Sequence, residues 1–233
     1  MSNEVLHLSN AQAILVKGQH PFEVENHDAI AVTWQRLQAE NPALYNGRTV
    51  LAESWSVHDG VFSAVCREVD YATLLHWLKG PKGDGRAVAL HFYAAPAIIS
   101  GDGKAIMGRM AAHTANAGGI YFPSGSMERE DFTNGMADFA GNMRREVLEE
   151  TGLDLNDARA SQGYLLWQGR GVAALIREYR FEETAETLRR KMLDFCRSEK
   201  SDGELEDIMA FGPGETDLAM PGPMRAWLAQ FEG

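Results

Sequence analysis

The amino-acid sequence predicts a fold that mixes α-helices with β-strands. Short apolar runs bounded by glycine, proline or asparagine recur along the chain, and they are typical of strands. Between them lie a few longer segments that carry the periodicity and the end signals of helices. Strands interleaved with a few helices indicate an α+β architecture or an α/β sandwich on a mixed sheet. The 233 residues suffice for one large domain, or for one domain with an added subdomain.

The first part of the chain predicts an α+β region. A helix is expected over Ala29–Ala39, because the N-cap candidates Asn26 and Asp28 precede it and an Asn-Pro pair follows it. The turn sequence His-Asp-Gly at 58–60 predicts a hairpin between Thr49–Ser56 and Val61–Val69. The other expected elements are a short apolar run at Ala13–Val16 and a short helix at Tyr71–Leu78.

A cluster of turn-forming residues marks a candidate domain boundary. Gly80, Pro81 and Gly83 follow the short helix closely. We therefore expect an N-terminal α+β region at residues 1–85 and a second domain at residues 86–233. The N-terminal region is expected to serve as a lid, a dimerisation surface or a specificity element.

The second part of the chain predicts more strands and three further helices. The strand candidate Ala87–Ile99 is followed by a turn at Ser100–Gly103. A long helix is expected from about Ala137 to Thr151, where Gly152 is well suited to end it. The other expected elements are strands at Lys104–Met110, Tyr164–Trp167, Val172–Phe181 and Ile208–Phe211, and helices at Thr184–Ser198 and Met224–Phe231.

The charge and the cysteine content exclude several classes of partner. The formal net charge of −11 disfavours nucleic acid and anionic membranes, and it also repels a phosphate-bearing substrate unless a cation is bound. Cys66 and Cys196 form neither a disulfide framework nor a zinc-ligand spacing, which fits a reducing cytoplasm. We expect no signal peptide at the N-terminus and no membrane span, because the most apolar stretch is too short to cross a bilayer.

The segment with the clearest chemistry lies on the long predicted helix. Glu146, Glu149 and Glu150 are spaced so that their carboxylates meet along one edge of a stripe formed by Met136, Ala140, Met143 and Val147. Three like charges beside a buried stripe are costly, and a hard divalent cation would remove the conflict. Oxygen-only ligands favour Mg²⁺, or Mn²⁺ as a substitute.

A simpler interpretation applies to these glutamates when they are taken alone. Glutamates on helices are usually solvated, and Arg145 with Glu149 is then an ordinary surface ion pair. A Glu-x-x-Glu-Glu pattern by itself favours this interpretation, because short motifs match often by chance. The surrounding residues decide otherwise.

The segment Arg145–Leu153 resembles the helical half of the Nudix motif, Arg-Glu-hydrophobic-x-Glu-Glu-x-Gly-hydrophobic, at every fixed position. The upstream Phe122–Gly125 resembles the Pro-Gly-Gly entry of that motif, with Ser124 in place of one glycine. The chain departs from the family pattern after Asp131, which stands where glutamate is usual. Thirteen residues separate Asp131 from Arg145, where the family has seven. The box is enlarged, but the spacing of the three helical glutamates is unchanged.

The resemblance implies a Nudix-type α/β/α sandwich with a mixed sheet, and an N-terminal extension. It implies Mg²⁺-dependent hydrolysis of a phosphoanhydride bond in a nucleoside diphosphate linked to another group. It further implies that Glu146, Glu149 and Glu150 bind the metal, with Glu146 the better candidate for a base and Arg145 orienting a glutamate. The backbone carbonyl near Gly125 would add a ligand. An acid from a later loop would complete the site, with Glu204 the first choice and Glu206 the second.

Residues for substrate binding are less sharply marked. His113 and Asn116 lie in the glycine-rich segment before the box, and Arg109, Arg129 and Arg170 are cations that would suit a phosphate. Trp167 or Tyr121 would suit stacking on a base. Taken singly, such arginines are more often ordinary surface charges, such a histidine is more often structural, and such aromatics are more often part of the core.

Two alternatives remain open at this point. A Nudix domain that binds a nucleotide without cleaving it would act as a sensor, and an unrelated fold would leave the helix as a charged surface. The substrate also remains open among ADP-ribose, UDP-sugars, dinucleotides, coenzyme A and oxidised nucleotides. We expect a small nucleotide as the partner, and a homodimer is one possible assembly.

Overall fold

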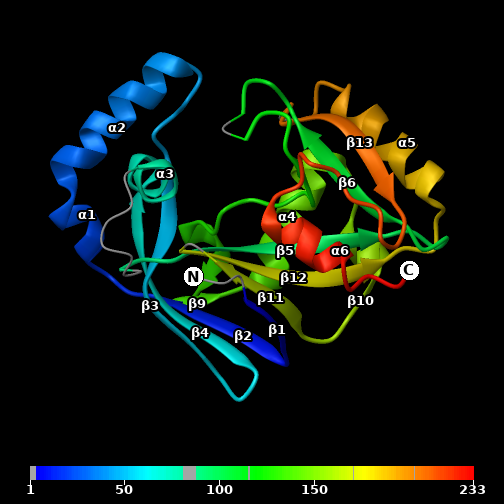
Figure 1. Ribbon diagram of the computed structural model, residues 1–233, viewed down its shortest axis with the longest axis horizontal. Coiled ribbons are helices and arrows are strands. Elements are labelled where there is room, and N and C mark those ends of the chain that lie inside the picture. The colour runs from blue at the N-terminus through cyan, green and yellow to red at the C-terminus, as the bar shows by residue number, and fades with distance from the viewer. Residues whose placement is uncertain (1–3, 81–87, 115, 170, 202) are drawn as a thin grey trace.

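The structure is a computed structural model that describes residues 4–80, 88–114, 116–169, 171–201 and 203–233 (Figure 1). Within these ranges it contains two mixed β-sheets and six α-helices, which confirms the predicted mixed α/β fold class. The predicted boundary near residue 85 and the cation Arg170 lie outside the described residues. No helix in the described ranges is both long enough and apolar enough to span a bilayer.

The larger sheet forms the centre of the molecule. Parallel pairing of β12 with β5 joins two antiparallel halves. Its strands, in spatial order, are β1 (Glu4–Leu8), β11 (Tyr164–Gly169), β12 (Val172–Arg180), β5 (His91–Ile99), β6 (Ala105–Met110) and β13 (Leu205–Phe211), with β10 (Arg159–Ala160) beside β12 and β7 (Ile120–Tyr121) beside β6.

The smaller sheet comes mostly from the N-terminal region. The hairpin predicted at residues 58–60 is present, and Asp59 and Gly60 adopt the positive φ angles of 48° and 72° that a tight hairpin turn requires. The strands of this sheet, in spatial order, are β3 (Arg48–His58), β4 (Val61–Asp70), β2 (Asn10–Leu15), β9 (Met136–Ala137) and β8 (Phe132–Thr133).

Helices cover both faces of the larger sheet. Figure 1 shows α6 crossing in front of this sheet and α4 behind it, while α1, α2 and α3 lie together at one side of the molecule. The helices are α1 (Pro21–Glu25), α2 (His27–Glu40), α3 (Tyr71–Lys79), α4 (Phe139–Thr151), α5 (Ala185–Cys196) and α6 (Gly222–Leu228), with short 3₁₀ turns at Arg129–Asp131 and Leu155–Asp157.

Strand β5 shows how the core is divided. Its successive side chains point to opposite faces, as the pleat of a strand requires. Phe92, Ala94 and Ile98 join a core that also contains residues of α4, α5 and the smaller sheet. Ala95, Ala97 and Ile99 join a second core beneath α6. Because both faces are buried, the strand is an almost continuous apolar run, as the sequence indicated.

Helix α4 begins and ends at sequence signals that are visible in its bonds. The Asp138 carboxylate caps the first turn by accepting a hydrogen bond from Gly141 N at 2.8 Å. Gly152 ends the helix with a φ angle of 71°, where a Cβ would meet the Phe195 ring at 2.4 Å. The prediction that Met136 lies on the buried stripe of this helix is wrong. Met136 pairs with Ile14 in the smaller sheet and is 47% exposed.

The N-terminal region contributes to both sheets. Strand β1, which the sequence did not reveal, pairs along its whole length with β11 of the larger sheet. The Trp77 indole of α3 donates a hydrogen bond to the Gly171 carbonyl at 2.8 Å, and Asn41 donates one to the His113 carbonyl at 2.9 Å. These contacts bring α3 and the end of α2 against the loops that surround the candidate site.

Candidate functional site

Two adjoining cavities meet at the loop Ser124–Ser126, which is called the Gly125 loop. The first, called the acidic cavity, has a volume of about 530 Å³ and is lined by Glu128, Glu146, Glu149 and Glu204 among others. The second, called the aromatic cavity, has a volume of about 510 Å³ and is lined by Tyr93, Tyr121 and Trp167 among others. Their shared wall is formed by Met110, Asn116, Ser124, Gly125 and Ser126.

Asp131 organises the enlarged loop. Its side chain is 5% exposed and accepts hydrogen bonds from Glu128 N at 2.8 Å and from Asn142 Nδ2 at 2.9 Å. Both of its carboxylate oxygens also lie 3.2 Å from Nη2 of Arg145. The aspartate therefore holds together the loop, the first turns of α4 and the arginine of the motif.

The extra residues of the box form a separate hairpin. The Asp131 carbonyl accepts a hydrogen bond from Asp138 N at 2.8 Å, so the ends of the intervening segment Phe132–Ala137 are joined. These residues form β8 and β9 around a turn in which Asn134 and Gly135 have φ angles of 52° and 79°. The hairpin extends the smaller sheet through β2. This is why the enlarged spacing leaves Asp131 beside Arg145.

Arg145 is surrounded by carboxylates. Its Nη2 lies 2.7 Å from Oε1 of Glu146, and its Nη1 lies 3.2 Å from Oε2 of Glu149. Burial alone would lower the pKa of Arg145, but the adjacent Glu146 and Asp131 raise it above its ordinary value. The guanidinium is therefore charged and holds the two glutamates of the acidic cavity.

Glu146 lies against the backbone of the loop. A Cβ built on Gly125 would lie 2.3 Å from Oε2 and 2.5 Å from Oε1 of Glu146, so only glycine permits this approach. The side chain of Glu146 is 13% exposed. Burial raises the pKa of Glu146 to about 7; Arg145 counteracts the increase, while Glu149, Asp131 and Glu128 add to it.

The expectation that all three glutamate carboxylates meet is not fulfilled. Glu146 and Glu149 line the acidic cavity, whereas Glu150 is 4% exposed and lines the aromatic cavity. Among the described residues no three Asp, Glu, His or Cys side chains are close enough to hold a metal ion. The Gly125 loop, which lies against Glu146, forms part of the wall between the two cavities.

The residues of the acidic cavity nevertheless fit a hard divalent cation. Their donors are carboxylate oxygens, the class that Mg²⁺ and Mn²⁺ prefer. Burial raises the pKa of Glu146 to about 7 even though Arg145 is in contact with it, and the neighbouring carboxylates of Glu149, Asp131 and Glu128 add to the increase. An additional positive charge at this position would lower the free energy of the ionised form.

The other predicted site residues are partly brought together. Glu204, His113 and Asn116 line the acidic cavity. Glu206 lies at a bulge between Leu205 and Asp207 of β13 and lines neither cavity. Both aromatics that were considered for stacking, Tyr121 and Trp167, line the aromatic cavity.

Two of the predicted phosphate-binding arginines lie away from both cavities. Arg109 precedes Met110 on β6, and because neighbouring strand residues face opposite ways, Met110 lines the cavities while Arg109 lies 3.5 Å from the Met209 sulfur. Arg129 lies 3.9 Å from Glu68 of the smaller sheet and lines a different hollow.

No family model matches the chain, and no curated protein matches it. Solved structures are similar to it, among them the following three. A protein of Deinococcus radiodurans is 10% identical with a TM-score of 0.43, over 60% of this chain and 82% of that one. The MutT protein of Methanosarcina mazei is 15% identical with a TM-score of 0.42, over 61% and 92%. A bifunctional NMN adenylyltransferase/ADP ribose pyrophosphatase of Francisella tularensis, complexed with AMP and a manganese ion, is 18% identical with a TM-score of 0.36, over 60% and 37%.

Several residues of the site were not found from the sequence. The N-terminal region lines the acidic cavity with Ala43, Leu44, Tyr45, Gly47, Arg48, Thr49 and Tyr71. On β5, His91 and Tyr93 line the aromatic cavity. The two β5 residues carry a recognisable signal, since polar aromatic side chains at alternate positions of an otherwise apolar strand share one face. The N-terminal residues carry none, because only the fold brings them near α4.

Proposed function

We propose that this chain is a Nudix-type hydrolase that cleaves a phosphoanhydride bond in a nucleoside diphosphate linked to another group, with Mg²⁺ as cofactor and Mn²⁺ as a substitute. The observation that supports this most is the position of Glu146. It is a largely buried carboxylate of the acidic cavity, in contact with Arg145 and pressed against Gly125, which belongs to the wall shared by the two cavities. A diphosphate at that wall would have one cavity on each side for its two substituents.

Acids on both sides of this wall would hold the metal ion, together with the backbone at Gly125: Glu146, Glu149 and Glu204 of the acidic cavity and Glu150 of the aromatic cavity. When bound, the ion would supply positive charge to the phosphate oxygens as the bond breaks. Arg145 would hold Glu146 and Glu149 in place through its ion pairs of 2.7 and 3.2 Å. His113 and Asn116, which line the same cavity, would contact the substrate.

Glu146 is the residue that we propose as the base. Its carboxylate is largely buried against Gly125 in the acidic cavity, where it would accept a proton from an attacking water molecule. In the reaction the oxygen of a water molecule forms a bond to one phosphorus of the substrate, and the bond from that phosphorus to the bridging oxygen breaks. The proton of the water passes to the Glu146 carboxylate. The products are two phosphate esters, and no oxidant or reductant is required.

The N-terminal region, taken as residues 1–85, is proposed as the specificity element. Tyr45, Arg48 and Tyr71 come from it and line the acidic cavity opposite α4. Burial raises the pKa of Tyr71, with the nearby Glu204 adding to the increase, so this phenol is neutral at physiological pH. These side chains would contact the substituent of the diphosphate that enters the acidic cavity.

The first test removes two of the acids. A Glu149→Gln, Glu150→Gln double variant should lose at least about a hundredfold in turnover, because charge stabilisation of this kind contributes several kcal/mol to a transition state. Its thermal stability should stay level or rise, since like charges four residues apart or less destabilise a helix. Activity is measured as phosphate-ester release with Mg²⁺ over ADP-ribose, UDP-glucose, a diadenosine polyphosphate and coenzyme A.

A matched pair of variants tests the later acid. Glu204→Gln should lower turnover, whereas Glu206→Gln, two residues away and outside both cavities, should not. Retention of full activity in the Glu149→Gln, Glu150→Gln variant would contradict the proposal. Equal losses in the Glu204 and Glu206 variants would remove Glu204 from the site.

One observation favours a second candidate, a nucleotide-binding domain without hydrolysis. Arg145 pairs with both Glu146 and Glu149, and within the described ranges the acids do not form a ready metal cluster. In that case every compound of the panel would stay intact with Mg²⁺ or Mn²⁺, while nucleotides still bound. Turnover of any one compound that depends on Glu149 and Glu150 would exclude this candidate.

A further inference from the structure

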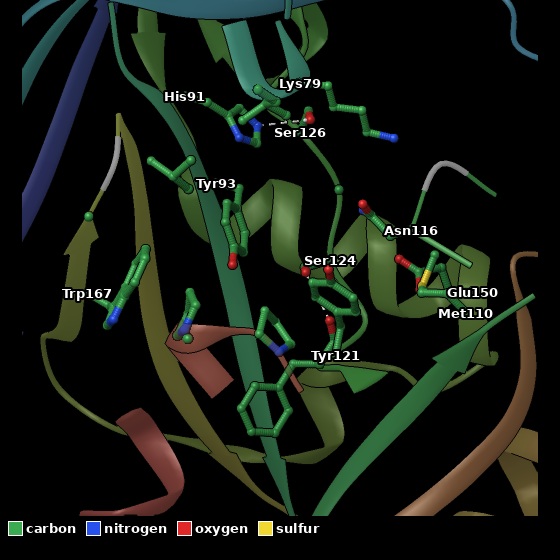
Figure 2. A pocket seen from close by; sticks show the side chains of 18 of the residues that line it. Lys79, His91, Tyr93, Met110, Asn116, Tyr121, Ser124, Ser126, Glu150 and Trp167 are labelled. Carbon is green, nitrogen blue, oxygen red and sulfur yellow. Dashed lines mark hydrogen bonds between the residues drawn. The ribbon is translucent and has the colours of Figure 1, made fainter. Parts of the chain in front are cut away.

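The aromatic cavity has the size and the walls of a small-molecule site. Its volume of about 510 Å³ falls within the range of roughly 300–1,000 Å³ that is usual for ligand pockets. Tyr93 comes from β5, Tyr121 from β7 and Trp167 from β11, so three strands of one sheet place aromatic rings in it. Figure 2 shows Trp167 at one end, Glu150 and Asn116 at the other, and the Tyr93 ring between them.

The polar groups of the inner part are neutral. His91 stacks on Tyr93 with ring centroids 5.7 Å apart, and its Nε2 lies 3.2 Å from the Ser126 hydroxyl. Burial lowers the pKa of His91 to about 4 and raises that of the Tyr93 phenol, so both are uncharged near pH 7. The charged residues of the lining, Lys79 and Glu150, lie toward the other end from Trp167 (Figure 2).

Two glycines leave the backbone accessible in this cavity near Trp167. Gly169 and Gly222 both belong to the lining. A Cβ on Gly222 would lie 2.9 Å from Cζ2 of Trp167, so a larger residue there would press on the indole ring. Flat rings, neutral hydrogen-bonding groups and close backbone suit a planar heteroaromatic ring better than a sugar or a phosphate.

We propose that the aromatic cavity binds the nucleobase of the substrate, and that the diphosphate leaves it across the Ser124–Ser126 loop toward the acidic cavity. This inference rests on the proposed function for the identity of the substrate. It assigns the two halves of that substrate to separate cavities. The base lies among Tyr93, Tyr121 and Trp167, and the second group lies against the N-terminal residues of the acidic cavity.

The test measures binding without any cleavable bond. The full chain is titrated with AMP, UMP and ribose 5-phosphate by calorimetry. Ribose 5-phosphate has the sugar and the phosphate but no base. At least one of the two nucleotides should bind about tenfold more tightly than ribose 5-phosphate, which is within the range that stacking of one base provides.

Variants of half-buried tyrosines locate the effect. Tyr121→Leu should reduce the advantage of the nucleotide to about threefold or less, and Tyr121→Phe, which keeps the ring, should restore most of it. Tyr164→Leu is the matched control, because Tyr164 is similarly half-buried, lies on β11 and lines neither cavity. Trp167→Phe provides a second variant that keeps an aromatic ring in the core.

The outcomes separate this inference from the hydrolase itself. Equal binding of ribose 5-phosphate and both nucleotides would overturn it, and so would equal losses in Tyr121→Leu and Tyr164→Leu. Hydrolysis of several substrates with no dependence on the base would also overturn it and leave the hydrolase standing. Base-dependent binding that is lost in Tyr121→Leu, with no hydrolysis of any compound, would support it and refute the hydrolase.

Discussion

Replacing Gly125 with alanine tests whether the approach of the loop to Glu146 controls the reaction. The added Cβ would lie 2.3–2.5 Å from the three atoms of the Glu146 carboxylate group, well inside any normal contact. Gly125 does not have a positive φ angle, so alanine suits its backbone. The carboxylate, held by Arg145 at 2.7 Å, is the group that has to move.

The magnitude follows from that displacement. Relief of a contact of about 2.4 Å to an ordinary separation of 3.4 Å or more requires a shift of about 1 Å. A misplacement of this size costs on the order of a hundredfold in rate when the group takes part in the chemistry. We therefore expect Gly125→Ala to lower kcat about a hundredfold. The melting temperature should change by less than about 4 °C, because only a flexible side chain is displaced.

Gly212→Ala is the matched control. Gly212 also lacks a positive φ angle, and its Cβ would meet its nearest neighbours at 3.5–3.7 Å, which is ordinary contact. A double-mutant cycle gives the sharper test. In a Glu146→Gln background, Gly125→Ala should have little further effect, because both changes act through one carboxylate. Full activity in Gly125→Ala, or additive losses in the cycle, would refute the reasoning.

Three other predictions concern stability, each measured by thermal or denaturant unfolding. Asp131→Asn should cost roughly 1.5–3 kcal/mol by weakening the charged contacts to Arg145 and Glu128 N, and an unchanged unfolding free energy would contradict the role of Asp131. Gly135→Ala should cost about 1–2 kcal/mol at its φ of 79°, whereas Gly212→Ala should not. Burial lowers the pKa of His91 to about 4. The protein should therefore lose stability as the pH falls from about 6.5 to 4, because His91 takes up a proton in the unfolded chain at a higher pH than in the folded protein. That loss is at most about 3 kcal/mol and should be smaller in His91→Gln.

The elements that the sequence predicted well carry their signals locally. The turn at residues 58–60 and the helix end at Gly152 both require positive φ angles, and the glycines at positions 60 and 152 predict both features. Strand β5 was placed from its apolar run, although it begins at His91, four residues later than expected. Leu90, just before it, makes a single bridge to Ala52 of β3 instead.

The elements that were missed depend on partners far away in the chain. Strand β1 has an unremarkable sequence and exists because β11, some 160 residues later, offers it an edge. The hairpin at Phe132–Ala137 has strands of two residues each, too short for any periodicity. Its strand β9 is also what shortened helix α4, since Met136 and Ala137 pair in a sheet instead of starting the helix.

Several residues that the sequence singled out line the two cavities, but the sequence did not predict how they are divided between the cavities. Helical spacing put Glu146, Glu149 and Glu150 along one edge of the predicted helix. It carried no information about the Gly125 loop, which lies against Glu146 and forms part of the wall between the two cavities. Tyr45 and Tyr71 could not be found for the same reason, because their proximity to α4 is a property of the tertiary fold.

The backbone hydrogen bond from Asp138 to Asp131 has a consequence for how such motifs are compared. Where the two ends of an inserted hairpin are held together, the number of residues in the hairpin does not set the distance between the residues on either side of it. Counting residues between the acid and the arginine makes this chain look like a distant outlier. In space, however, the two ends of the hairpin lie together, so the position of the acid relative to the arginine is unchanged. The hairpin could therefore be shortened or lengthened at its turn without altering the contact between Arg145 and Asp131.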